Sequence, residues 1–402
     1  MYNHLIKIGG SAISSASDFK NLCKVISNYR SGKTIIIISA FGKTTRNLLK
    51  AAETAYSGNE TAAIKIIDEI FDFHYSLSNK TLNLNEYKEK LLRMIKGIIL
   101  TKELTPKLTD KILSAGENLA LATIKSNFDA DDFVFLESSN FIITDSNFGK
   151  ANPIIQKSSE LTISTLNQAN GRTIITQGYI AKDINGCPTT MGFESSNLTA
   201  TLIADFADLK ELTIFSNVDG IRNIDPKIYP TTDLVKNLNY SDALSLADYG
   251  LKLLYSPMIE LSANNSIKIV YRNLISKNDD FTIISENKSD FDFIILHSEL
   301  QKNIGKDDNT KPILRITDHH QSVVFTDIAD HPVVESGQTD IYSQYIIFYK
   351  NPSLLNKLFN RISKLDNILI DNYIPNAIRL IIKTDTNKFV LEDILNLFDE
   401  KL

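Results

Sequence analysis

The fold is decided near the start of the chain, by the run Leu5-Ile6-Lys7-Ile8-Gly9-Gly10-Ser11. Its apolar part is too short for a helix and predicts a strand, and the two glycines predict a tight turn where that strand ends. From Asp18 to Tyr29 the apolar residues recur at helical spacing, and Thr34–Ser39 is a β-branched run that is typical of a parallel strand covered on both faces. Residues 5–39 therefore predict one strand–helix–strand unit.

The same alternation continues outward from this unit. Helical patterns follow at 47–57, 60–73, 86–100 and 107–127. Strands, among them Phe141–Thr144, then alternate with helices as far as Phe281–Ser285. This order predicts an α/β domain of three layers over residues 1–285.

The composition changes after residue 285. Residues 286–311 are mostly polar and predict a connecting segment, and residues 312–402 alternate strands and helices in the manner of a small α+β module. The two helices of that module are expected at 354–364 and 391–399. A chain of 402 residues exceeds the length at which one core usually stops growing, which agrees with two domains.

Charge and composition exclude several classes of protein. The formal net charge is −5, so no basic face for nucleic acid is expected. No apolar run approaches the roughly 20 residues that span a bilayer, and the first residues do not resemble a secretory signal. The two cysteines, Cys23 and Cys187, carry no disulfide or metal motif. We therefore expect a cytoplasmic protein that does not bind membranes.

Two motifs follow the first two strands. Lys7 with Gly9 and Gly10 suits a phosphate group, because glycines let backbone N–H groups approach phosphate oxygens and the lysine adds positive charge. The alternative is a purely structural turn. Small and hydroxylic residues at Ser39–Thr45 lie at the carboxyl end of a parallel strand, where open α/β sheets bind ligands. The alternative there is that Thr44 or Thr45 only caps a helix.

Two further motifs occur later in the chain. Gly116 interrupts a helical pattern, at a cost of about 1 kcal/mol, and so indicates close approach of another backbone or a ligand. Its neighbour Glu117 is either a site residue or an ordinary surface residue. The turn-rich stretch Asn217–Lys227 follows a strand directly and suits an adenine or ribose.

In this order the motifs resemble those of the aspartate kinases of the amino-acid kinase family. Seven signatures match in family order, at Lys7–Ser11, Ser39–Thr45, Ser114–Glu117, Thr144–Ala151, Gly178–Ile180, Asn217–Lys227 and Ser245–Pro257. The carboxyl-terminal module is similar to the paired ACT domains of that family in strand and helix order only. The resemblance implies an amino-acid-kinase (carbamate-kinase-like) sandwich with an ACT-like regulatory module, through which the chain would form a homodimer.

The chain departs from the family in the loop Thr189–Asn197, which lies before the strand that leads to Asn217–Lys227. The arginine that grips the substrate carboxylate in the family is Phe193 here, and two glycines are Glu194 and Ser195. The family aspartate that contacts the substrate amino group is Asn197. These changes put the identity of the acceptor in doubt. Smaller changes place Asn217, Arg222 and Tyr255 where aspartate, tyrosine and histidine are usual.

By resemblance, the reaction is ATP-dependent phosphorylation of a carboxylate, L-aspartate to 4-phospho-L-aspartate, in amino-acid biosynthesis. Lys7 and Asn197 would be catalytic. The phosphates and nucleotide would be bound by Gly9, Gly10, Ser11, Ser216, Asn217, Arg222, Lys227 and Lys252. The acceptor would be bound by Thr45, Glu117, Tyr179, Phe193 and Ser196. Mg²⁺ would bridge phosphate oxygens with few protein ligands.

Two other functions stay open at this point. Loss of the arginine fork at Phe193 favours a kinase of the same fold that acts on a different small carboxylate. A non-catalytic paralogue that binds nucleotide and regulates another protein is the third reading. Release of ADP with aspartate and then with a panel of carboxylates would separate the three.

Overall fold

The computed structural model describes residues 2–78, 82–129, 131–229, 231–275, 280–304, 314–318, 321–327, 341–350, 368–371 and 377–383. The chain divides into two compact units. The first unit contains residues 1–221, 236–247 and 252–289, and the second unit contains residues 222–235, 248–251 and 290–402. The helices predicted at 354–364 and 391–399 lie outside the described residues.

The first unit is built on an eight-stranded sheet. Its strands are β1 (His4–Ile8), β2 (Thr34–Ile38), β3 (Phe133–Leu136), β5 (Thr173–Gln177), β8 (Glu211–Ser216), β9 (Asn237–Asn239), β10 (Lys268–Asn273) and β11 (Phe281–Ser285). They pair in the order β3-β5-β2-β1-β8-β10-β11-β9. All neighbours are parallel except β10 and β11, so the predicted α/β fold is confirmed with a mixed sheet. β1 lies in the interior of the sheet between β2 and β8, where its carboxyl end is flanked on both sides.

Helices cover both faces of this sheet. Successive side chains of a strand point to opposite faces, so β2 contributes to two cores. Ile36 and Ile38 belong to the core formed with helix α1 (Ala16–Ser27). Ile35 faces a small apolar space lined also by residues of α6 (Ile155–Gln168) and α7 (Ser195–Phe206). The sheet therefore lies between helices on either side, as the buried apolar strand predicted.

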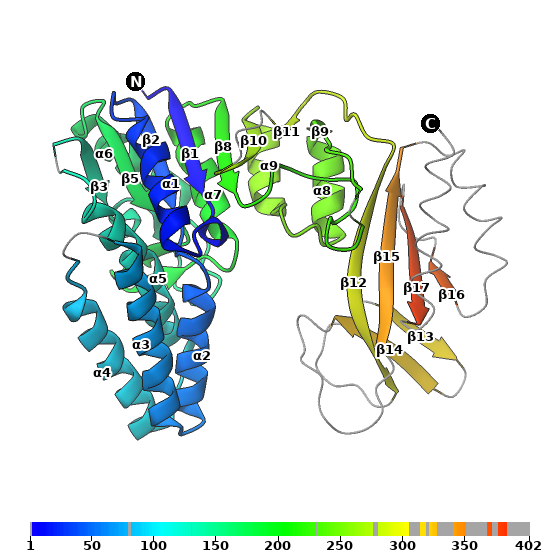
Figure 1. Cartoon of the computed structure of the whole chain (residues 1–402), viewed down its shortest axis with the longest axis horizontal. Helices are drawn as coiled ribbons and strands as arrows, with labels where there is room; N and C mark the ends of the chain where they lie inside the picture. Colours follow the sequence, from blue (N-terminus) through cyan, green and yellow to red (C-terminus); the bar gives the residue numbers. More distant parts are fainter. Residues whose placement is uncertain are drawn as a thin grey trace. The chain divides into compact units, whose positions relative to one another are not determined.

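Four helices extend away from the sheet (Figure 1). They are α2 (Thr44–Tyr56), α3 (Glu60–Leu77), α4 (Asn85–Thr101) and α5 (Pro106–Lys125), and they share one core of apolar side chains. A separate three-stranded sheet joins β4 (Ile143–Thr144), β6 (Ile180–Asp183) and β7 (Pro188–Thr190). α5 is long enough to contact both this small sheet and the main sheet.

Some elements differ from the sequence-based expectation. Helix α1 begins at Ala16 rather than Asp18, because the side chain of Ser15 accepts a hydrogen bond from the backbone N–H of Asp18 and caps the helix. The strand expected at Phe141–Thr144 is reduced to β4, since a 3-10 turn at Ser138–Asn140 precedes it. Two short helices, α8 (Tyr240–Asp248) and α9 (Ser256–Asn264), lie between β9 and β10 in the sequence. The sequence predicted α8 but not α9.

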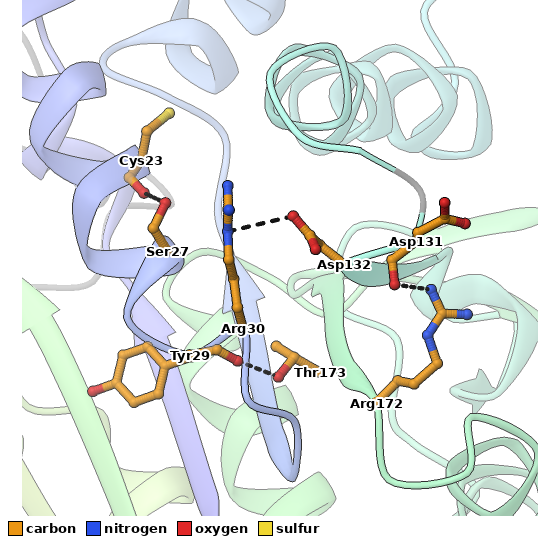
Figure 2. A network of polar contacts seen from close by, with 8 residues as sticks. All are labelled: Cys23, Ser27, Tyr29, Arg30, Asp131, Asp132, Arg172 and Thr173. Carbon is orange, nitrogen blue, oxygen red and sulfur yellow. Dashed lines mark hydrogen bonds and ion pairs between the residues drawn. The ribbon is translucent and has the colours of Figure 1, made fainter.

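Polar contacts tie together the turns that lead into β2, β3 and β5 (Figure 2). The Arg30 guanidinium lies 3.4 Å from the Asp132 carboxylate, and the Thr173 hydroxyl donates to the carbonyl of Tyr29 at 2.5 Å. The Arg172 guanidinium donates to the Asp131 carbonyl at 3.0 Å. These contacts lie at the amino-terminal ends of the strands, so they stabilise the sheet at the end opposite to the one where its parallel strands finish.

The second unit contains a six-stranded antiparallel sheet. Its strands are β12 (Phe293–Ile304), β13 (Leu314–Asp318), β14 (Gln321–Asp327), β15 (Ile341–Tyr349), β16 (Ile368–Asp371) and β17 (Ala377–Lys383), in the order β13-β14-β12-β15-β17-β16. β12 runs through the stretch 286–311 that the sequence indicated as a polar connection. The boundaries at 285 and 311, and the likeness to an ACT module, stay predictions.

Candidate active site

A cavity of about 400 Å³ opens where β1 and β2 end. Nine of the residues predicted for the site line it: Lys7, Gly9, Gly10, Ser11, Thr45, Glu117, Tyr179, Phe193 and Ser196. Seven further residues complete the wall: Ser14, Ser39, Ala40, Gly42, Lys43, Arg46 and Glu194. The carboxyl ends of two parallel strands therefore meet three helices, α2, α5 and α7, in one concave site.

Two glycines let the walls of the cavity approach each other. A Cβ atom on Gly10 would lie 1.8 Å from the carbonyl oxygen of Ala40, and the N–H of Gly42 donates to the Gly10 carbonyl at 2.9 Å. A Cβ on Gly116 would lie 3.0 Å from the Ala40 Cβ and 3.4 Å from the Thr45 hydroxyl. A glycine inside α5 therefore does mark close packing, but the groups that approach it are side chains of the loop and helix after β2 and not a backbone.

The loop between β2 and α2 is not a simple helix cap. The hydroxyl of Thr44 donates to the carbonyl of Phe41 at 2.7 Å, and the N-cap of α2 is Lys43, which has no side-chain capping hydrogen bond. The alternative in which Thr44 or Thr45 caps the helix is therefore wrong. Thr45 instead lines the cavity.

Lys7 and Glu117 are the buried ionisable residues among those that line the cavity. Burial lowers the pKa of the Lys7 ammonium, and the negative charges of Glu194 and Glu117 oppose that shift. Burial raises the pKa of the Glu117 carboxyl to about 8. The side chain of Glu117 is 3% exposed, its Oε1 accepts the Ala40 N–H at 3.1 Å, and its Oε2 has no partner. A carboxyl held neutral in this way has an O–H to donate to a bound anion.

Two residues that line the cavity have a strained backbone. Tyr179 and Glu194 both have positive φ, 64° and 67°, which costs a non-glycine residue about 1–2 kcal/mol. The ring of Phe193 lies 6.4 Å from the ring of Tyr179, and its side chain is 56% exposed at the cavity. A Cβ on Gly178 would lie 2.7 Å from the Cα of Ser196, so this turn packs directly on α7. Strain of this kind occurs where a site holds its backbone in a fixed position.

Asp110 is a functional candidate that the sequence reasoning missed. It is fully buried on α5, and its carboxylate accepts from the Gly149 N–H at 2.9 Å, the Thr190 N–H at 3.0 Å and the Thr190 hydroxyl at 2.6 Å. Glu117 is two helical turns further along α5, on the same face. Asp110 therefore fixes α5, and with it Glu117, to the end of β7 just before the Phe193 turn.

The family model of the amino acid kinase family matches residues 4–273. The chain belongs to this family. Among its relatives, aspartokinase 2, chloroplastic, of Arabidopsis thaliana is 26% identical over 386 residues, which are 91% of this chain and 70% of the relative. The aspartokinase of Chlamydia muridarum is 27% identical over 256 residues, 63% of this chain and 57% of the relative.

The fold is shared with solved aspartokinase structures. The crystal structure of Escherichia coli aspartokinase III in complex with aspartate and ADP has a TM-score of 0.76 and 16% identity, over 98% of this chain and 99% of that one. The Clostridium acetobutylicum aspartate kinase has a TM-score of 0.70 at 16% identity, over 99% of this chain and 100% of that one. At this identity the likeness concerns the fold.

Several family positions lie away from the cavity wall. Asn197 is buried in the first turn of α7, and its Oδ1 has no partner. Ser216 ends β8 beside the glycine loop, because the N–H of Gly9 donates to the Phe215 carbonyl at 2.8 Å. Asn217 and Lys252 are exposed. The remaining two nucleotide candidates, Arg222 and Lys227, belong to the second unit, where the guanidinium of Arg222 donates to the Thr232 carbonyl at 2.7 Å.

Within the described residues, no group of three or more His, Cys, Asp or Glu side chains is arranged to hold a metal ion. Across the same part of the chain, no helix has the length and apolar character to cross a membrane. Cys23 and Cys187 form no disulfide, and each is half-buried. The Arabidopsis relative is chloroplastic, so a cytoplasmic location for this chain stays a prediction.

Proposed function

We propose that the chain transfers the γ-phosphoryl group of ATP to a carboxylate of a small acceptor, with L-aspartate as the leading acceptor and 4-phospho-L-aspartate as its product. In this reaction an acceptor carboxylate oxygen bonds to the γ-phosphorus while the bond to the bridging oxygen breaks, and ADP leaves. Such transfer needs positioning and charge stabilisation rather than a covalent intermediate. The family and the relatives named aspartokinase support this reaction class.

The observation that carries the proposal is that Lys7 and Glu117 line the same cavity, beside the glycine loop. Lys7 would stabilise the transferring oxygens, and the N–H groups at Gly10 and Ser11 would approach the β- and γ-phosphates. Negative charge from bound phosphate opposes the burial that lowers the pKa of Lys7, so phosphate binding favours its charged form. Protonated Glu117 would donate to the acceptor or to the phosphoryl group.

Mg²⁺ is part of the proposal as a charge carrier on the nucleotide. Mg²⁺ would be held mainly by phosphate oxygens and water, as is usual for this ion at a nucleotide. Mg²⁺ would neutralise part of the phosphate charge. The residues of this chain would then orient the nucleotide and the acceptor around it.

The turn before α7 favours a second candidate within the same class. Phe193 lines the cavity with a ring where the family has an arginine that binds the substrate carboxylate. Asn197 has no negative charge to balance the ammonium group of an amino-acid substrate. An acceptor other than aspartate therefore fits the same machinery. A non-catalytic nucleotide-binding regulator with homodimerisation through residues 312–402 is the third candidate.

The test is formation of ADP together with an acyl phosphate trapped by hydroxylamine, with aspartate and with a panel of small carboxylates. Lys7→Ala should lower turnover by about 10²–10³-fold, the usual effect of removing one preorganised charged donor. Lys65→Ala, on the exposed face of α3 and outside the cavity, is the matched control and should change nothing. Equal turnover in Lys7→Ala would refute its role, and nucleotide binding without any hydroxamate would favour the regulator.

A further inference from the structure

Two basic side chains line the part of the cavity that α2 contributes. Lys43 and Arg46 flank Thr45, line the cavity and are exposed. Among the described residues, neither takes part in an ion pair or in a side-chain hydrogen bond. Their charges are therefore available to a ligand.

The helix itself adds to their effect. Lys43 and Arg46 belong to the N-cap and first turn of α2, whose free N–H groups are equivalent to roughly half a positive charge. A separate observation points to a ligand in the same space. Glu117 lines this cavity and is only 3% exposed, and its buried Oε2 has no hydrogen-bond partner.

The lining residues from 179 onward include no cation. They are Tyr179 and Phe193, whose ring centroids lie 6.4 Å apart, together with Glu194 and Ser196. The charge of Glu194 acts on Lys7, so this carboxylate faces the Lys7 side of the cavity. An anionic group of an acceptor that extends from Lys7 is attracted toward α2 and not toward the turn before α7.

We propose that Arg46, assisted by Lys43, holds the second carboxylate of the acceptor, and that the acceptor is a short dicarboxylate whose other carboxylate lies beside Lys7. Arginine suits this task because its planar fork forms two parallel hydrogen bonds to a carboxylate. The inference rests on the proposed function, and it moves the anchor for the acceptor from the turn that ends in Phe193 to the first turn of α2.

The experiment measures binding, so that it does not depend on turnover. Succinate and propionate are titrated calorimetrically into the wild-type chain, Arg46→Gln, Lys43→Gln and Lys50→Gln. Lys50 is exposed on α2 one turn beyond Arg46 and does not line the cavity, which makes it the matched control. Thermal unfolding and binding of a non-hydrolysable ATP analogue report whether each variant keeps its fold and nucleotide site.

For Arg46→Gln the dissociation constant of succinate should rise about ten- to a hundredfold, as expected for loss of a hydrogen bond to a charged group. Lys43→Gln should give a smaller rise and Lys50→Gln none. Propionate, which has one carboxylate, should bind equally to all four chains. Unchanged succinate binding in Arg46→Gln, or no succinate binding by the wild type, overturns the inference. Binding that depends on Arg46 in a chain without turnover would retain this anchor and reject the proposed function.

Discussion

Replacing Glu117 by glutamine removes a buried ionisable group and should change how stability depends on pH. Burial raises the pKa of this carboxyl from 4.5 to about 8. Below pH ~4.5 the carboxyl is protonated in the folded and the unfolded chain, so it has no effect. As pH rises toward 8, the unfolded chain releases this proton first, and the wild-type protein loses stability.

The size of this loss follows from the shift. One pKa unit corresponds to about 1.4 kcal/mol, so the rise from 4.5 to about 8 corresponds to roughly 5 kcal/mol as an upper bound, lost between those pH values. Glutamine has the same shape as the protonated acid and keeps an oxygen for the Ala40 N–H. Glu117→Gln should therefore show a flatter profile, and be the more stable protein near pH 8 by several kcal/mol.

The assay is urea unfolding at intervals between pH 5 and pH 8.5, with the free energy of unfolding compared between the two proteins. Glu53→Gln, at an exposed position of α2, is the control and should follow the wild type throughout. Parallel profiles for wild type and Glu117→Gln would refute the reasoning. They would mean that Glu117 ionises in the folded chain as easily as in water.

Three further changes test the geometry of the cavity. Gly10→Ala places a Cβ 1.8 Å from the Ala40 carbonyl oxygen and should lower the melting temperature by several degrees. The control is Gly97→Ala inside α4, where a Cβ has nothing within 4 Å and should raise stability by about 0.5–1 kcal/mol. Equal melting temperatures for the two variants would contradict this. Asp110→Ala leaves the buried donors of Gly149 and Thr190 unpaired, and should lower the free energy of urea unfolding by at least about 3 kcal/mol. A loss of unfolding free energy below about 1 kcal/mol would show that water replaces the carboxylate. Glu194→Gly relieves a positive φ and should stabilise by about 1 kcal/mol; a loss of stability would show that the carboxylate has a structural role.

The parts of the structure that the sequence predicted well are those with strong local signals. The all-isoleucine run of β2 and the spaced apolar residues of α1 both produced elements at the expected places. Gly116 indicated close approach inside a helix, and a Cβ there would lie 3.0 Å from the Ala40 Cβ. Gly10 was interpreted as giving access to a phosphate, and the structure shows that it also packs against the Ala40 carbonyl. The α/β fold followed from the alternation of these elements.

Elements whose formation depends on distant partners were not predicted. β12 contains polar residues throughout its second half, and its strand form is specified by pairing with β14 and β15 on either side. β6 and β7 are short, and the latter is held by Asp110, which is about 80 residues earlier in the chain. Propensity alone does not reveal such pairings.

The site showed the same division. Motifs identified Lys7 and Glu117. Lys43 occupies a variable position of the Ser39–Thr45 motif and Arg46 follows that motif, so only the folded chain shows that both line the cavity. Their signal in the sequence was two basic residues around Thr45 at a helix start, where acidic residues are usually favoured by the helix dipole. That reversal of the usual preference would have been sufficient reason to consider an anionic ligand.

The division into units has a consequence for protein synthesis. Residues 222–235 and 248–251 emerge from the ribosome inside the first unit's sequence, yet their contacts are made with strands that follow residue 290. The N–H of Ile295 donates to the Asn223 carbonyl at 2.7 Å, and the ring of Tyr249 lies 6.0 Å from that of Phe348. Asn223 must therefore wait about 70 residues of translation for Ile295, and Tyr249 about 100 residues for Phe348. A stop codon near residue 285 would remove Ile295 and Phe348, and both segments would lose these contacts, so the chain is not divisible at the point where its family motifs end.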